Sequence, residues 1–452
     1  MFKRKLETDL NKWRKRPGRK PLVLRGARQV GKTSLINEFG KQYKQYINLN
    51  LESKADRRLF TEYTDFNTLV QQIFFNHNKV LAGKNDTLIF IDEIQEVPEA
   101  LQALRFFYEQ YPEISVIAAG SMLESLFLKD VSFPVGRVEF LVLRPFSFSE
   151  FLEASGEQAA LEHLSIIPTA DFAHEKLLSL FHEYVLIGGM PEVISHYINN
   201  KDVVALSEVY ESLIASYLED AEKYSKSDAQ TLHIRHVVSN MFGYAGKRIK
   251  FEGFGNSSYK SRDMGDALRL IEKAFLIHLV YPVTATQMPV VQNVSKSPRL
   301  HVLDTGLLNY FSGIQKEILG SSDISSAYRG LVAEHIVGQE MLSFQNKPLS
   351  KLLFWTREKN TSMAEVDYLF PYKGNLIPIE VKSGGEGKLK SLHLFMDDCW
   401  HDIAIRYYGG KPAFNNVKTK VGKEFRLLSL PYYSVSVIEK YLEQIEVLPW
   451  KM

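Results

Sequence analysis

Residues 26–33 have the types and spacing needed to bind a phosphate chain. Their sequence, GARQVGKT, fits the pattern G-x-x-x-x-G-K-[ST] and lies between an apolar strand and a helix. The glycines let backbone N–H groups surround phosphate oxygens, and the helix N-terminus adds a positive dipole. Lys32 can reach the β- and γ-phosphates, and the Thr33 hydroxyl can ligate Mg²⁺. We therefore predict a nucleotide site formed by Gly26, Ala27, Arg28, Gln29, Val30, Gly31, Lys32, Thr33 and Ser34.

An acidic pair follows the apolar segment TLIFI at residues 87–91. Asp92 can hold the Mg²⁺ directly or through water, and Glu93 can polarise a water molecule for attack on the γ-phosphate. The alternative is a solvent-exposed acidic pair at a strand end, which the apolar run and the phosphate motif disfavour. The pair therefore favours hydrolysis over nucleotide binding alone.

Two further positions are candidates for contact with the γ-phosphate. Ser121 ends the segment ISVIAAGS, and in P-loop proteins with an extra strand between the two phosphate motifs a polar residue here senses this phosphate. Arg137, or with less support Arg144, can supply positive charge to the γ-phosphate of a neighbouring subunit. An ordinary strand-end serine and a surface arginine are the structural alternatives.

A second group of charged residues lies near the C-terminus. Asp367 in EVDYLF is followed by the turn PYKGN and by LIPIEVKS, which contains Glu380 and Lys382. This pattern predicts a hairpin in which Glu380 and Lys382 share one strand face beside Asp367, with Glu334 reaching in from the preceding helix. It is the D…E-x-K arrangement of metal-dependent nucleases, in which Asp367 and Glu380 hold Mg²⁺ and the lysine activates water or stabilises charge.

The E-x-K spacing also arises by chance on solvated strand faces. Apolar neighbours make bare charges costly here unless they are paired or bind metal. Perturbed pKa values around Asp367 would favour an enzyme, whereas a Lys382 side chain directed into solvent would favour a regulatory domain. A nuclease-like fold does not by itself establish nuclease activity.

Strand and helix signals divide the chain into four predicted domains. Residues 1–146 alternate apolar strands with helices, which predicts a buried parallel sheet with helices on both faces. Residues 147–224 are helical, with a turn at 188–191. Residues 225–312 have two helices followed by two strands, which indicates a winged helix. Residues 313–452 are expected to form a small α/β domain.

The amino-acid composition limits the classes of protein to which the chain can belong. The 452 residues are 45% hydrophobic and 24% charged, as in globular proteins, which excludes disordered, collagen-like and coiled-coil chains. No apolar run approaches the roughly 18 residues of a membrane span, and the N-terminus lacks a signal peptide's apolar stretch. We therefore expect a cytoplasmic protein without a membrane partner. The single cysteine, Cys399, excludes an intramolecular disulfide.

Positive charge gathers in two places although the net charge is only +2. Residues 1–20 hold nine Lys or Arg, and a second cluster consists of Lys247, Arg248, Lys250, Lys260 and Arg262. Such clusters can neutralise phosphates, but they are more often solvated faces, and winged helices also bind proteins. The overlap of the second cluster with the predicted winged helix favours DNA as a partner.

Several segments together resemble a large prokaryotic family of AAA+-like ATPases whose C-terminal domain of unknown function is related to PD-(D/E)XK nucleases. They are KPLVLRGARQVGKTSL, IFIDEIQEVPEAL, the stretch ending AAGS, FPVGRVEFLVLRPFSFSEFL, IGGMPEV and RLHVLDTGLL. The resemblance covers nearly the whole chain and implies ATP as the nucleotide. Met-Leu follows Ser121 where small polar residues are expected. AAA+-like ATPases commonly form rings, which makes a homo-oligomer plausible.

We therefore predict an α/β protein with an AAA+-like P-loop NTPase core, a helical lid, a winged helix and a C-terminal restriction-endonuclease-like domain. It is expected to bind and hydrolyse ATP with Mg²⁺ and to act on DNA, with a metal-dependent nuclease step at Glu334, Asp367, Glu380 and Lys382. The alternative is an ATP-driven regulatory switch whose nuclease-like domain is catalytically silent and only binds nucleic acid or protein.

Overall fold

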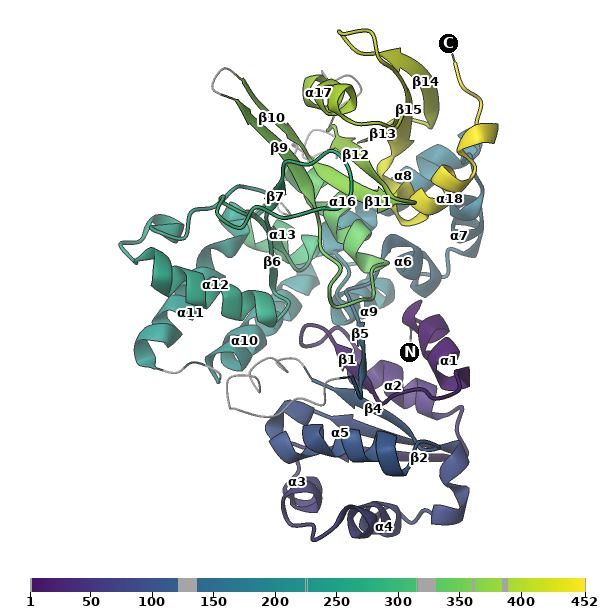
Figure 1. The fold of residues 1–452 in the computed structure, drawn as a ribbon, viewed down its shortest axis with the longest axis vertical. Helices are drawn as coiled ribbons and strands as arrows, with labels where there is room; N and C mark the ends of the chain where they lie inside the picture. The colour runs from purple at the N-terminus through teal and green to yellow at the C-terminus, as the bar shows by residue number, and fades with distance from the viewer. Residues whose placement is uncertain are drawn as a thin grey trace. The chain divides into compact units, whose positions relative to one another are not determined.

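A computed structural model gives the fold of most of the chain (Figure 1). The residues described are 2–120, 136–223, 225, 227–313, 315, 331–359, 362–383 and 389–451. They form two compact units: an N-terminal unit of Met1–Arg144, Lys273–Phe275 and Gln345–Ser350, and a C-terminal unit made of the remainder. The candidate phosphate sensor Ser121 lies outside the described residues.

The N-terminal unit alternates strands with helices, as predicted. Its elements are α1 (Leu6–Lys15), β1 (Leu22–Arg25), α2 (Lys32–Gly40), β2 (Gln45–Asn50), α3 (Lys54–Thr61), α4 (Phe66–Asn76), η1 (Leu81–Asp86), β3 (Thr87–Asp92), η2 (Ile94–Glu96), α5 (Pro98–Gln110), β4 (Ser115–Ala119) and β5 (Glu139–Val142). The strands are parallel, in the order β2-β3-β4-β1-β5. Strand β4 therefore separates the strand before the phosphate loop from the strand that ends in the acidic pair.

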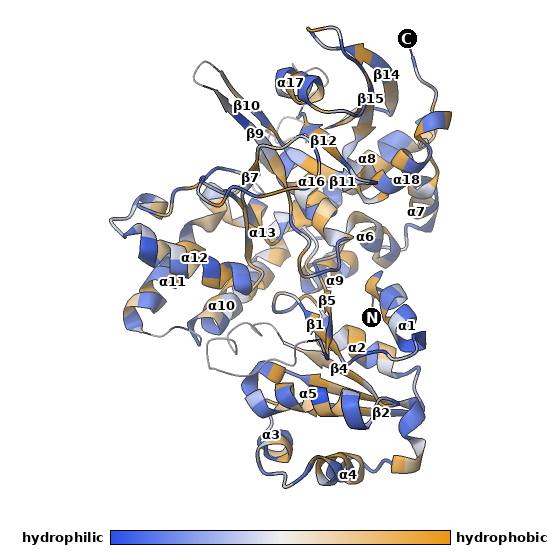
Figure 2. Ribbon diagram, viewed as in Figure 1, coloured by the Kyte–Doolittle hydropathy of each residue, from blue (hydrophilic) through white to orange (hydrophobic). Residues whose placement is uncertain are grey.

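Both faces of this parallel sheet are buried. Ile89 and Ile91 of β3 belong to one hydrophobic cluster with residues of α3, α4 and α5. Leu88 and Phe90 are also fully buried and point to the opposite face, and α2 packs against β3 and β4. Figure 2 shows hydrophobic and hydrophilic residues side by side along α5. The prediction of a buried parallel sheet with helices on both faces is confirmed.

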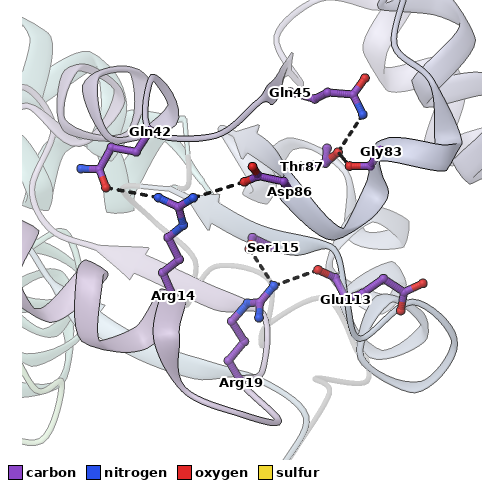
Figure 3. Close-up of polar contacts among 9 residues, drawn as sticks. All are labelled: Arg14, Arg19, Gln42, Gln45, Gly83, Asp86, Thr87, Glu113 and Ser115. Atoms are coloured by element: carbon purple, nitrogen blue, oxygen red, sulfur yellow. Dashed lines mark hydrogen bonds and ion pairs between the residues drawn. The ribbon is translucent and has the colours of Figure 1, made fainter.

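Basic residues near the N-terminus make contacts within the N-terminal unit. Arg14 forms an ion pair with Asp86 at 3.2 Å, and Arg19 donates a hydrogen bond to the Ser115 hydroxyl at 2.8 Å (Figure 3). Arg16 pairs with Glu139 of β5. These contacts attach the end of α1 and the segment after it to η1 and to strands β4 and β5.

The C-terminal unit begins with helices and continues with three sheets and further helices. Its elements are α6 (Phe148–Ala154), α7 (Gln158–Ser165), η4 (Asp171–Ala173), α8 (His174–Ile187), α9 (Pro191–Asn200), η5 (Val204–Leu206), α10 (Ser207–Glu222), α11 (Asp228–Asn240), η6 (Met241–Tyr244), η7 (Phe254–Asn256), α12 (Ser261–Lys273), β6 (Ile277–Val280), β7 (Pro282–Val283), β8 (Arg299–Val302), α13 (Thr305–Phe311), α16 (Leu331–Ser343), β9 (Phe354–Lys359), β10 (Ser362–Val366), β11 (Tyr368–Tyr372), β12 (Asn375–Val381), α17 (Lys390–Asp398), β13 (Ile403–Tyr408), β14 (Ala413–Lys418), β15 (Glu424–Pro431), η8 (Tyr432–Val437), α18 (Ile438–Glu443) and η9 (Ile445–Val447).

Three sets of strands form in this unit. Strands β6 and β8 pair antiparallel after helices α11 and α12, which is the order predicted for residues 225–312. A three-stranded sheet has the order β10-β9-β7, and a five-stranded sheet has the order β11-β12-β13-β15-β14. In the larger sheet β11 and β12 form an antiparallel hairpin, and α17 connects β12 to the parallel strand β13.

Asp367 of the predicted acidic motif lies just before the hairpin and not within one of its strands. Strand β10 ends at Val366 and β11 begins at Tyr368, so Asp367 lies at a bend between two strands. The tight turn to β12 has positive φ at Lys373 and Gly374, 45° and 81°, as in the two-residue turns that suit the twist of a hairpin.

The turn at residues 188–191 packs against the start of α13. Asp304, fully buried, accepts hydrogen bonds from the backbone N–H groups of Leu307 at 3.1 Å and Gly189 at 2.6 Å. Gly188 has φ 77° and ψ −169°, a conformation that is essentially restricted to glycine. A Cβ on Gly188 would lie 2.2 Å from Asp304 Oδ1. The segments IGGMPEV and RLHVLDTGLL are thus direct packing partners.

Replacing Gly188 with alanine should strongly destabilise the C-terminal unit. We expect the free energy of unfolding to fall by about 2–6 kcal/mol, because backbone strain of about 1–3 kcal/mol adds to overpacking of about 1–3 kcal/mol. Urea unfolding followed by circular dichroism measures the loss. Gly156→Ala is the matched control: its φ is also positive, +74°, but its Cβ would meet nothing within 4 Å. Equal losses in the two variants would contradict the proposed contact with Asp304.

Candidate functional site

The predicted phosphate loop joins β1 to α2. Gly26 has φ +145°, and a Cβ there would lie 2.3 Å from the Leu143 carbonyl oxygen. Gly31, with φ 92°, immediately precedes α2. The loop therefore needs glycine at both ends, where a side chain would clash or strain the backbone. The N-terminus of α2 follows the loop directly, in the place where a helix dipole favours bound phosphate.

Lys32 is buried and held by the loop itself. Its ammonium group donates hydrogen bonds to the carbonyl oxygens of Gly26 at 3.0 Å and Ala27 at 2.8 Å. These bonds keep the ammonium beside the backbone that is predicted to surround the phosphates. An incoming phosphate oxygen can take the place of a carbonyl oxygen as its partner.

Thr33 and Asp92 meet although 59 residues separate them. The Thr33 hydroxyl donates to Asp92 Oδ2 at 2.6 Å, and Asp92 Oδ1 accepts the backbone N–H of Glu93 at 3.1 Å. Burial raises the pKa of Asp92, while the Thr33 hydrogen bond and the charge of Lys32 oppose this shift. A hydroxyl and a carboxylate in contact fit Mg²⁺, which is commonly held by one or two carboxylates together with water and substrate phosphates.

Glu93 has an uncommon backbone conformation. Its φ is 52°, and non-glycine residues in this region cluster at functional sites. Gln95 donates its amide N–H to Glu93 Oε2 at 2.5 Å, so it can orient the predicted catalytic carboxylate. Gln95 was not among the predicted residues. The feature of the sequence that could have indicated Gln95 is its position two residues after Glu93, within IDEIQ.

The two candidate arginines have different environments. Arg137 is exposed and forms an ion pair with Glu109 at 3.0 Å. Arg144 is buried, and its carbonyl oxygen accepts a hydrogen bond from Arg4 at 2.6 Å. An arginine that acts on a neighbouring subunit must be accessible, so Arg137 remains the better candidate.

The four predicted C-terminal residues come together. Asp367 Oδ2 accepts the backbone N–H of Val381 at 2.7 Å, which places the Asp367 carboxylate next to Glu380. Lys382, one residue beyond the end of β12, contacts Glu380 Oε1 through its ammonium group at 2.5 Å. The charge of Asp367 acts on Glu334 of α16 and on Glu380. Helix α16, the bend and strand β12 thus form one carboxylate cluster, defined as Glu334, Asp367 and Glu380.

Burial controls the protonation of the carboxylate cluster. It raises the pKa of Glu334 to about 8 and that of Glu380 to about 7, and the charge of Asp367 adds to both shifts. Burial also raises the pKa of Asp367. A hydrogen bond and the positive charge of Lys382 counteract the shift at Glu380. The three groups therefore hold protons more tightly than exposed carboxyl groups do.

The cluster offers a limited set of cation ligands. Glu380 Oε2 is buried without a hydrogen-bond partner in the structure, which suits an oxygen that binds a cation. Across the described part of the chain, no group of three or more His, Cys, Asp or Glu side chains is arranged to hold one metal ion. Asp367 and Glu380 would supply two carboxylates, which fits Mg²⁺ because this ion usually keeps several waters and also binds substrate phosphates.

Comparisons with known proteins agree with the N-terminal geometry. Residues 18–152 match the family model described as AAA domain (AAA_14), a range that contains the phosphate loop, the acidic pair and β4. The N-terminal unit has the fold of a P-loop ATPase. Residues 178–318 and 329–424 match two models described as domains of unknown function, DUF8612 and DUF4143.

No curated protein matches the chain. Among solved structures, it is similar to the Walker-type ATPase PABY2304 of Pyrococcus abyssi, with 17% identity and a TM-score of 0.43 over 69% of this chain and 96% of that chain. In the ranges that the structure describes, no helix combines the length and apolar character required to cross a bilayer.

Sequence reasoning missed a buried cation that contacts the bend of the carboxylate cluster. Arg299 of β8 donates to the Asp367 carbonyl oxygen at 2.9 Å and forms an ion pair with Glu365. The only signal in the sequence was a charged residue opening the apolar strand RLHV. Two charged residues outside the D…E-x-K pattern, Arg299 and Glu365, thus lie beside the carboxylate cluster.

The protonation of Glu334 predicts how stability depends on pH. An unfolded glutamate titrates near pH ~4.3, whereas Glu334 has a folded pKa of about 8. Between these values the folded state binds the additional proton, so the free energy of unfolding falls as pH rises, by up to about 1.4 kcal/mol per pH unit. Urea unfolding at pH 5 to 8 should give a shallower dependence for Glu334→Gln. Part of the slope should remain in Glu334→Gln, because burial also raises the pKa values of Glu380 and Asp367. The exposed Glu439→Gln control should keep the wild-type slope, and a slope in Glu334→Gln equal to that of the wild-type protein would refute the assignment.

Proposed function

We propose that this protein binds and hydrolyses ATP with Mg²⁺, acts on DNA, and cleaves phosphodiester bonds at its C-terminal carboxylate cluster. The observation that carries the ATPase part of the proposal is the 2.6 Å contact between Thr33 and Asp92, with Glu93 adjacent. It supports the assignment of the phosphate loop and the acidic pair to one site of phosphate hydrolysis. Arg137 is proposed to complete this site in a neighbouring subunit of a homo-oligomer.

In the ATPase step each residue has a separate task. Backbone N–H groups of the loop and the Lys32 ammonium bind the phosphates, and Thr33 and Asp92 would hold the metal ion. Mg²⁺, when bound there, neutralises negative charge that develops on the phosphates. Glu93, oriented by Gln95, accepts a proton from the water that attacks the γ-phosphorus.

In the nuclease step Asp367 and Glu380 would hold Mg²⁺ against the scissile phosphate. Lys382 lies where it can stabilise negative charge on the phosphate or orient the attacking water. Two observations favour this step over a silent domain. The carboxyl groups have raised pKa values in a buried site, and Lys382 is held by Glu380 with a side chain only 25% exposed.

The second basic cluster supplies the proposed DNA contact. Lys247, Lys250, Lys260 and Arg262 are exposed. Lys247 and Lys250 lie between η6 and η7, Lys260 directly precedes α12, and Arg262 is in its first turn, all within the segment predicted as a winged helix. Phe254, by contrast, is buried, so this aromatic residue belongs to the core and is not available to stack on bases. Contacts to phosphate would make binding fall steeply with salt.

The test uses plasmid, linear and single-stranded DNA with Mg²⁺ or Mn²⁺, with and without ATP. We expect cleavage by the wild-type protein and a loss of about 100-fold or more in Asp367→Asn, with ATP hydrolysis intact. Lys32→Ala shows whether ATP controls cleavage. ATP hydrolysis without cleavage of any substrate would instead favour the regulatory switch, and a wild-type protein without ATP hydrolysis would overturn the ATPase proposal.

A further inference from the structure

Arg299 is a buried arginine whose backbone is held from both sides. Strand β8 pairs with β6 along one edge. Along its other edge, the Leu300 carbonyl oxygen accepts the N–H of Gly246 at 2.7 Å, and the Leu300 N–H donates to the Lys247 carbonyl oxygen at 3.0 Å. Because the main chain on both sides of Arg299 is fixed, its side chain reaches the carboxylate cluster from a rigid support.

The guanidinium group makes directed contacts with the bend at Asp367. One nitrogen donates to the Asp367 carbonyl oxygen at 2.9 Å, and another pairs with Glu365, the second residue before it. At a bend the strand ladder does not supply a partner for this carbonyl, and a buried carbonyl without a donor is costly. Arg299 therefore supplies the hydrogen-bond donor for the backbone carbonyl oxygen that lies between β10 and β11.

Packing restricts the guanidinium further. Its carbon lies 4.6 Å from the centre of the Phe354 ring and 5.9 Å from that of the Tyr368 ring. The Tyr368 hydroxyl in turn donates to the carbonyl oxygen of Glu334 at 2.8 Å. The side chain of Arg299 is only 5% exposed, so it has little freedom to leave this place.

The positive charge acts on the whole carboxylate cluster. The Arg299 guanidinium lowers the pKa values of Glu334, Asp367 and Glu380 against the larger effect of burial. Burial disfavours the charged form of Arg299, whereas the charges of Glu365, Asp367 and Glu334 favour it. One cation from outside the D…E-x-K pattern is thus shared by every acidic member of the cluster.

We infer that Arg299 is a positioning residue of the carboxylate cluster. Its contacts with Glu365 and with the Asp367 carbonyl oxygen fix the conformation of the bend. The Asp367 carboxylate therefore keeps its hydrogen bond to the Val381 N–H and its position next to Glu380. The inference deepens the nuclease part of the proposed function, because the Asp367 carboxylate would be a metal ligand there. The forked guanidinium is essential, since a lysine ammonium cannot span both partners in the same geometry.

The amide proton of Val381 reports the position of the Asp367 carboxylate directly, because it donates to Asp367 Oδ2. Site-resolved hydrogen exchange on the full chain should show it exchanging at least about tenfold faster in Arg299→Met and Arg299→Lys. The ladder amides of Ile377 and Ile379 should keep their wild-type rates. Arg426→Met is the matched control, because Arg426 also forms ion pairs within the same unit, with Asp402 and Glu446.

Unchanged exchange at Val381 in Arg299→Met would overturn the inference. So would equally faster exchange throughout β12, which would make Arg299 only a contributor to overall stability. Wild-type exchange at Val381 in Arg299→Lys would show that charge alone suffices and would also contradict it.

Calorimetric titration with Mn²⁺ separates this inference from the proposed metal site. If the wild-type protein binds Mn²⁺ and Asp367→Asn does not, Arg299→Met should bind it about tenfold more weakly, as expected for a partner that orients a metal ligand. Unchanged Mn²⁺ affinity in Arg299→Met would count against the inference. No Mn²⁺ binding by the wild-type protein would overturn the metal site, while the exchange at Val381 would still decide the role of Arg299.

Discussion

Replacing Glu93 with glutamine should lower the turnover number for ATP by about 10²–10⁴-fold, the range typical of a lost general base. Glutamine keeps the size of the side chain and can still contact Gln95, but it cannot accept the proton of the attacking water. The phosphate loop and the contact between Thr33 and Asp92 do not depend on the Glu93 side chain. The affinity for ATP should therefore remain within a few-fold of the wild-type value.

Phosphate release and binding of a fluorescent ATP analogue measure these two quantities separately. Glu96→Gln is the matched control, because Glu96 lies on the short helix η2 that directly follows Glu93 and pairs with Arg57 at 3.3 Å. It should keep near wild-type turnover. Full turnover in Glu93→Gln would mean that another group activates the water, and an equal loss in Glu96→Gln would mean that the segment matters only as structure.

The geometry of the proposed nucleotide site was largely predictable because its information is local. The residues from Gly26 to Thr33 specify a strand, a loop and a helix start within one short segment, and the apolar run before Asp92 specifies a central strand. Even the contact between Thr33 and Asp92 follows once β1, which precedes the phosphate loop, and β3, which ends at Asp92, lie in one parallel sheet. Gln95 was missed because its role depends on the positive φ of Glu93, which periodicity does not reveal.

The carboxylate cluster was predictable only in part. Glu380 and Lys382 follow from strand alternation, and Asp367 follows from the hairpin. The bend at Asp367 was not predictable, because EVDYLF has the composition of one continuous strand. Arg299 contributes from 68 residues earlier in the chain, and a contact of that kind arises from packing between sheets. No sequence motif links Arg299 to Glu365, so the ion pair between them could not be predicted from residue spacing.

Buried charge explains why these unpredicted partners exist. Bringing several carboxyl groups into one buried site is costly unless protons, cations or hydrogen bonds compensate. Arg299 and Lys382 supply two positive charges to the cluster from different elements. The same cost explains why Glu334 and Glu380 have raised pKa values. A buried group of carboxylates costs folding free energy, and a purely structural role does not explain that cost. This is a physical reason to test the cluster for catalytic activity.

Replacing Lys382 with methionine should lower the rate of DNA cleavage by about 10²–10³-fold, the usual effect of losing one group that stabilises developing charge. Methionine retains a similar length but no charge. ATP turnover should stay at the wild-type value, because the proposed ATP site is formed by residues of the N-terminal unit. Single-turnover cleavage of a labelled duplex measures the effect. Lys373→Met, an exposed lysine of the same hairpin, should cleave as the wild-type protein does.

The pH dependence of the remaining cleavage distinguishes a direct role for Lys382 from a general loss of structure. Lys382 lowers the pKa of Glu380, which burial holds at about 7. Without the lysine this pKa should rise, so the carboxylate that would bind the cation forms only at higher pH. The residual rate in Lys382→Met should therefore have its rising limb shifted upward in pH. A lower rate with an unshifted profile would mean that the lysine does not act on Glu380, and an unchanged rate would remove Lys382 from the proposed site.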